Sequence, residues 1–277
     1  MKPNDIVIPR FLAAAVEELL TLSQFAAMVR LGFTVGSQLA PLLEQLARGL
    51  GLESEPGVSL LRAEAEEFGP YAASEANAGF TYVNSLLAVR LLTILESVVD
   101  EAVVDALRSR SDVLDVEAVR KLKGPLVDFM RASDADRSEL LAEMLSHETK
   151  ATFKTGVGKF EALLEIVGLG GGVDEEGRRG ILELTEVRNV VVHRRGRVDS
   201  RFLKMCPWLD IPSAHILVIT SEMFERYRRA VGYYLLEVTR RWVVREGHTA
   251  KELEPFLETL ERERHSLRKS FASEQAG

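Results

Sequence analysis

A single long stretch of helical periodicity limits the fold of this sequence more than any other feature. Between Phe80 and about Arg110, apolar residues recur at steps of three and four and cover most of a helix circumference: Val83, Leu86, Leu87, Val89, Leu91, Leu92, Leu95, Val98, Val99, Val103, Val104 and Leu107. A helix that is apolar nearly all round must be enclosed by other helices. The remaining sequence shows the same period and no convincing strand, so it predicts an all-α helical bundle.

The N-terminal part reads as a helical extension of that bundle. Residues 11–51 have the apolar spacing of a pair of helices, with a predicted break between Gly32 and Gly36. The run from Gly51 to Ser59 combines Pro, two Gly and acidic residues and is the clearest linker. We therefore expect an N-terminal helical extension over residues 1–55 and the bundle over residues 56–248.

Three further helices bear on the ends of the predicted elements. A short acidic helix should run from Leu60 to Phe68 and end at Gly69-Pro70. Ser213 can cap a long helix from Ala214 to about Arg245. Residues 249–277 should form a charged helix and tail.

Composition excludes several classes of protein. The 277 residues are 46% hydrophobic and 28% charged, which is typical of a globular chain. A formal charge of −7 means that nucleic acid can be attracted only by a local patch, such as the basic residues that follow His193. The single Cys206 excludes a disulfide framework, and no histidine has a partner at metal-ligand spacing. Without a long uninterrupted apolar run or a signal peptide, we expect a cytoplasmic protein without a membrane anchor.

The most informative local pattern lies between Glu183 and Gly196. Read as a helix, Ile181, Leu184, Val187 and Val191 form an apolar stripe, and Arg188 lies within it. Asn189 and His193 are one turn apart, with Glu186 on the same flank.

Arg188 and His193 have complementary chemistry. A cation in an apolar stripe needs a carboxylate, a carbonyl, a second subunit or a phosphate as acceptor. An imidazole can carry a proton near neutral pH. An arginine and a histidine together are the minimum set for cleaving RNA without metal. The alternative is an arginine at the edge of the core and a solvated histidine at a helix end.

The segment Arg188-Asn189-Val190-Val191-Val192-His193 resembles the signature of HEPN domains, which is an arginine, a polar residue, three variable residues and a histidine. The flanking segments, residues 182–187 and 195–199, resemble bacterial HEPN proteins of the RNase type. The resemblance covers roughly residues 80–245. It implies that the chain is a metal-independent endoribonuclease without a cofactor, and that it acts on RNA as a homodimer.

The resemblance also implies roles for individual residues. His193 would exchange a proton with a ribose 2′-hydroxyl or a leaving 5′-oxygen, Arg188 would stabilise charge on the phosphate, and Asn189 would orient His193 or hold the phosphate. Glu96 is the matching acidic position on the long helix that precedes the motif, although it could instead simply neutralise Arg188. Arg194, Arg195 and Arg197 would draw in the RNA backbone.

Two biological readings stay open. An RNase-type HEPN protein can serve as a toxin restrained by an antitoxin protein, or as a phage-defence effector. The alternative is a non-catalytic HEPN-like adaptor or sensor that dimerises and binds a nucleotide or a protein partner.

A second motif is rejected on its spacing. The segment from Lys154 to Lys159 has Gly and Lys residues like a phosphate-binding loop, but its spacing is wrong, Phe160 follows the lysine and the flanks are helical. We expect a plain loop between helices there.

Overall fold

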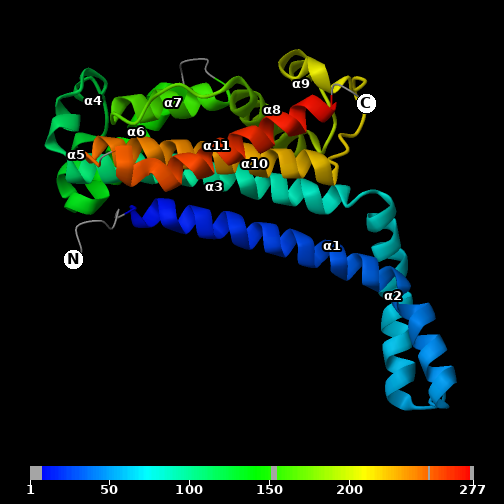
Figure 1. Cartoon of the computed structure of the whole chain (residues 1–277). Helices are drawn as coiled ribbons and strands as arrows, with labels where there is room; N and C mark the ends of the chain where they lie inside the picture. The colour runs from blue at the N-terminus through cyan, green and yellow to red at the C-terminus, as the bar shows by residue number, and fades with distance from the viewer. Residues whose placement is uncertain (1–7, 151–154, 249, 275–277) are drawn as a thin grey trace. The chain divides into compact units, whose positions relative to one another are not determined.

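The structure is a computed structural model that describes residues 8–150, 155–248 and 250–274 (Figure 1). These parts of the chain are almost entirely helical, which confirms the all-α prediction. The longer α-helices are α1 Arg10–Leu50, α2 Pro56–Asn77, α3 Thr81–Ser109, α6 Asp134–Lys150, α7 Val157–Ile166, α8 Glu175–Arg194, α10 Ser221–Arg245 and α11 Ala250–Glu274. The shorter ones are α4 Glu117–Arg120, α5 Leu126–Arg131 and α9 Ser200–Met205, with 3-10 helices at Ser111–Asp115 and Pro207–Leu209.

The chain folds as two compact units, and the boundaries between them fall inside helices. The small unit comprises Leu20–Leu87 and Val218–Phe224, and the large unit contains the rest. The small unit thus holds most of α1, all of α2 and the start of α3. The run from Gly51 to Ser59, expected to separate an extension from the bundle, lies within the small unit.

The small unit is built on the packing of α1 against α2. The ring of Phe33 stacks on that of Phe68, with 5.7 Å between the centroids, and Tyr71 meets Phe33 edge-on. The predicted break between Gly32 and Gly36 is wrong, because α1 is one continuous helix. A glycine inside a helix costs about 1 kcal/mol, but Gly36 leaves the space that the Phe68 ring occupies. Packing therefore offsets the weak helix propensity.

The prediction that a helix ends at Gly69-Pro70 is also wrong. Helix α2 continues through both residues to Asn77. A Cβ placed on Gly69 would lie 3.7 Å from the carbonyl oxygen of Gly36, so two glycines face each other where α1 and α2 approach. Their contact supports a helix that its own sequence would have interrupted.

In the large unit, α3, α8 and α10 supply much of the core. The predicted helix from Phe80 to Arg110 is confirmed as α3, and Leu91, Leu95 and Ala106 on it are fully buried. Helix α10 contributes the buried rings of Tyr227 and Tyr234.

Helix α10 begins later than the predicted Ala214. Residues before it run in an irregular segment, in which Ile216 forms an isolated bridge with Arg197 and the Leu217 amide donates to the Gly196 carbonyl at 2.8 Å. Ala214 has a left-handed φ of 63°, which no helix interior accommodates. The capping role expected for Ser213 is therefore wrong, and α10 starts at Ser221.

Helix α1 has the length and composition of a helix that could cross a membrane. An 18-residue window within it has a mean hydropathy of 1.4, and 28% of that window is buried in the fold. A single such helix does not establish a membrane protein, because core helices of soluble proteins meet the same criteria.

Candidate functional site

Helix α8 presents the Arg188–His193 motif. It begins after Asp174, with Glu175 and Glu176 in the first turn, where acidic side chains favour the positive end of the helix. It ends where Arg195 adopts the left-handed conformation with φ 52°, and Gly196 follows with φ 78°. The helical assignment of the motif is therefore confirmed.

Three of the four residues of the predicted apolar stripe of α8 are buried, whereas Val191 is half-buried, and Arg188 is half-buried as well. Ile181, Leu184 and Val187 have no solvent exposure. Glu186, expected on the flank near His193, is instead buried and forms an ion pair with Arg201 at 3.1 Å. The expected polar flank is thus reduced to Asn189, which is half-buried, and His193, which is exposed.

Arg188 and His193 lie against each other. The Arg188 Nη1 atom is 3.5 Å from the His193 Nε2 atom. A guanidinium only donates, so in a hydrogen bond between these two atoms Nε2 is the acceptor. Among the described residues, no carboxylate lies within ion-pair distance of Arg188. Within the described residues, the remaining donors of its guanidinium therefore have no carboxylate to bind.

A cavity of about 340 Å³ lies beside Arg188 in the large unit. Four helices supply its lining: Glu96 and Asp100 from α3, Ser146 from α6, Lys159, Phe160 and Leu163 from α7, and Arg188 from α8. The structure thus brings Glu96 and Arg188 to one cavity. Asn189 and His193 are not among its lining residues, so His193 stands at the surface beyond Arg188.

The ion-pair partner of Glu96 is Lys159, with 3.2 Å between Glu96 Oε1 and Lys159 Nζ. The alternative in which Glu96 directly neutralises Arg188 is therefore wrong. Lys159 is a residue that sequence reasoning missed. It belongs to the segment rejected as a phosphate-binding loop and expected to be a plain loop. That expectation is wrong from Val157 on, because α7 begins there and Lys159 lies in its first turn. Lys154 lies outside the described residues.

Only its helical spacing could have pointed to Lys159. Lys159 and Leu163 are one turn apart and line the same cavity. The bend before α7 is set by Gly156, which has a left-handed φ of 56°. A Cβ there would lie 3.0 Å from the Cα atom of Leu182 in α8. The close approach of α7 to α8 brings Lys159 to the Arg188 cavity.

The three arginines expected to bind RNA follow the end of α8 and are exposed. Arg194 forms an ion pair with Asp199 at 3.3 Å, and Arg197 donates to the Ala214 carbonyl at 3.4 Å. Arg195 makes no ion pair among the described residues. Two of the three are therefore partly engaged by the protein, and their charges still face solvent.

A buried polar cluster supports α8 on the side of Glu183. The Glu183 carboxylate has no solvent exposure and accepts hydrogen bonds from Tyr227 Oη at 2.7 Å, Trp208 Nε1 at 2.8 Å and Arg226 Nη2. Burial, and then the charges of Glu183 and Glu186, raise the pKa of the Cys206 thiol to about 12. This cluster fixes α8 against α10.

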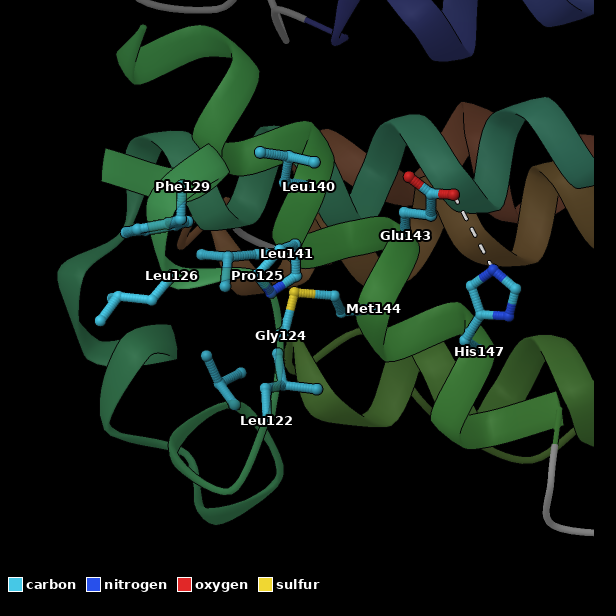
Figure 2. A pocket seen from close by; sticks show the side chains of 11 residues that line it. Leu122, Gly124, Pro125, Leu126, Phe129, Leu140, Leu141, Glu143, Met144 and His147 are labelled. Atoms are coloured by element: carbon cyan, nitrogen blue, oxygen red, sulfur yellow. Dashed lines mark ion pairs between the residues drawn. The ribbon is translucent and has the colours of Figure 1, made fainter. Parts of the chain in front are cut away.

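A second cavity of the large unit is mainly apolar. Figure 2 shows its lining, which includes Leu126, Phe129, Leu140 and Met144. The cavity has a volume of about 420 Å³. His147 lies at one end, 3.8 Å from Glu143. The cavity contains none of the motif residues. In the described parts of the chain, no three His, Cys, Asp or Glu side chains are grouped so that they could hold a metal ion.

No family model, no characterised protein and no solved structure matches this chain when it is compared with them. The HEPN resemblance therefore rests on the motif residues and their setting alone.

Proposed function

We propose that this chain is a metal-independent endoribonuclease of the HEPN type, with Arg188 and His193 as its catalytic residues. One observation supports this most directly: the Arg188 Nη1 and His193 Nε2 atoms are 3.5 Å apart, and Arg188 has no carboxylate partner in the described part of the chain. A cation and a base that meet in this way can bind one phosphodiester together.

The proposed reaction at the site is an intramolecular transesterification of the RNA strand. When RNA binds, the Arg188 guanidinium turns from His193 Nε2 to the phosphate. The unprotonated Nε2 atom then takes the proton of a ribose 2′-hydroxyl, the 2′-oxygen forms a bond to phosphorus, and the bond from phosphorus to the 5′-oxygen breaks. Arg188 donates to the phosphate oxygens, where negative charge increases. The leaving oxygen takes a proton from water or from the imidazole of a second copy. The products are a 2′,3′-cyclic phosphate and a 5′-hydroxyl.

Other residues of the cavity take supporting roles in this proposal. Lys159 adds a second cation within the cavity that Arg188 lines, and its ion pair with Glu96 holds it there. Asn189 orients His193 or holds the phosphate. Arg194, Arg195 and Arg197 attract the RNA backbone to the end of α8. A cytoplasmic homodimer, restrained by an antitoxin or acting in phage defence, is the setting that the resemblance implies.

The test is cleavage of a mixed-sequence RNA by the purified chain in excess chelator. We expect cleavage with 2′,3′-cyclic phosphate ends, and a fall of at least about 100-fold in rate for Arg188→Ala or His193→Ala. Arg178→Ala and His265→Ala are matched controls, because both residues are exposed and lie outside the site. Products with 5′-phosphate ends, or full activity in either site variant, would contradict the proposal.

A second candidate function is a non-catalytic HEPN-like adaptor or sensor that binds a nucleotide or protein partner. It is favoured by the charge balance of the cavity, in which Lys159 is paired with Glu96 and the Asp100 carboxylate lies nearby. Under this alternative, no RNA is cleaved in any condition, and Arg188→Ala lowers thermal stability without changing a catalytic rate.

A further inference from the structure

Helix α1 carries an apolar seam within the small unit. Its positions follow at alternating steps of three and four: Phe25, Met28, Gly32, Val35, Leu39, Leu42, Leu46 and Gly49. We call these residues the α1 seam. A seven-residue apolar repeat is the pattern with which one helix pairs with another in a coiled coil. The α1 seam runs beyond the roughly three heptads that mark such pairing.

The α1 seam faces solvent. Met28, Val35 and Leu46 are 63%, 50% and 52% exposed, and a Cβ on Gly32 or Gly49 would meet no atom within 4 Å. Helix α2 packs on a different face of α1, through Phe33 and Gly36. Single exposed apolar residues are ordinary, but a continuous exposed stripe of them marks an interaction surface.

The position of the charged residues on α1 indicates which kind of helix can pair with the α1 seam. Arg30 is the single charged residue between Leu19 and Leu43 in the sequence. Its side chain turns to the interior of the small unit, where it donates to Asn84 Oδ1 at 2.8 Å and lies over the Phe224 ring. A chain of net charge −7 repels its own copies in general. The residues of the α1 seam are all uncharged, so two copies paired there would not place like charges of the seam against each other.

A bilayer fits this surface less well than a helix does. Helix α2 is packed on α1 and carries the charged residues Arg62, Glu64, Glu66, Glu67 and Glu75, which lipid would have to accept as well. A helix that lies in the headgroup region needs a basic polar face. Within the small unit, α1 has Arg30, which turns inward, and Arg48, which pairs with Glu44 at 2.8 Å.

We propose that the α1 seam is a self-association surface that pairs with the α1 seam of a second copy of this chain. Both copies use the same residues, as in a two-fold symmetric dimer. The pairing does not depend on RNA cleavage, and it names the surface that joins two copies, which the proposed function leaves open.

The mass of the full chain in solution tests this proposal. Sedimentation or light scattering should give twice the chain mass of 30.8 kDa. The double variant Val35→Glu/Leu42→Glu should weaken association at least about 100-fold, because it places charges in the paired seam. Thr34→Glu is the matched control, since Thr34 is exposed on α1 next to Val35 and outside the α1 seam. It should remain dimeric.

A second measurement guards against misfolding of the charged variant. Val35→Cys, Leu39→Cys and Leu42→Cys, tested one at a time, should give at least one disulfide-linked dimer on mild oxidation. Cys206 is buried and cannot compete for that reaction. A monomeric wild-type chain, a double variant that stays dimeric, or equal loss of association in Thr34→Glu would overturn the proposal. A monomer that floats with phosphatidylcholine vesicles would do the same. Each of these results leaves the RNA cleavage assay unaffected.

Discussion

Arg188 differs from the buried arginines of the large unit in what it contacts. Arg226 is held by Glu183, and Arg241 is held by Glu161 at 2.8 Å and Glu237 at 3.1 Å. Such pairs compensate the cost of burying a cation. Arg188 instead contacts an imidazole and a cavity. Within the described residues, its guanidinium therefore has no carboxylate partner of the kind that holds Arg226 and Arg241.

The buried Cys206 thiol predicts how the stability of the fold depends on pH. Its pKa is about 12 in the folded chain, against an ordinary value of 9.0, because the thiol is buried near Glu183 and Glu186. The folded state therefore holds this proton more tightly than the unfolded state. The contribution of this proton to the free energy of unfolding is complete below pH 9 and is lost towards pH 12. Over that range the free energy of unfolding falls by up to about 1.4 kcal/mol per pH unit.

Urea unfolding between pH 8 and 11 measures this effect. The free energy of unfolding should fall less steeply with pH in Cys206→Ala than in the wild type. Iodoacetamide should label Cys206 at pH 9 only after urea is added. Rapid labelling of the native chain would show that the thiol is not buried.

At the scale of elements, glycines decide how closely the helices of this chain pack. Gly177 and Gly180 lower the helix propensity of α8, so the sequence alone disfavours a helix at these two positions. In the structure a Cβ on Gly180 would lie 2.7 Å from the Cβ of Ala230 in α10, and one on Gly177 would lie 2.9 Å from the Tyr233 ring. Both glycines are thus required for the contact that positions the motif helix.

Gly180→Ala tests this contact. The substitution raises helix propensity by about 1 kcal/mol but places a methyl group in a filled space, which costs about 1–3 kcal/mol. We expect a net loss of stability in thermal unfolding. Gly57→Ala in α2 is the control, because its Cβ meets nothing within 4 Å. A Gly180→Ala chain more stable than the wild type would show that α8 and α10 are further apart.

The sequence correctly predicted the helices that have a clear apolar spacing of their own. Helix α3 and the motif helix α8 follow from apolar spacing. The pairing of Glu96 with Arg188 came from the HEPN resemblance, and the structure places both residues at one cavity. The helix breaks expected at Gly32–Gly36 and at Gly69-Pro70 failed because the contact between α1 and α2 overrides local propensity. Lys159 was missed because its place in the cavity depends on how α7 packs against α8, and its helical spacing with Leu163 does not by itself show what that face of α7 contacts.

At the scale of the whole molecule, the two proposed surfaces differ in charge. The chain carries a net charge of −7, so the proposed RNA binding depends on the exposed arginines at the end of α8. The α1 seam lies in the small unit and is uncharged, which suits a second copy. Catalysis and self-association are therefore assigned to different units of the chain.

The central claim is that Arg188 and His193 act on the same phosphodiester, and a double-variant comparison of RNA cleavage rates in chelator tests it most directly. Residues that act as a unit give losses that do not add. We predict that Arg188→Ala/His193→Ala cleaves no more slowly than the slower single variant. Losses that multiply in the double variant, or single variants as fast as the wild type, would contradict the account.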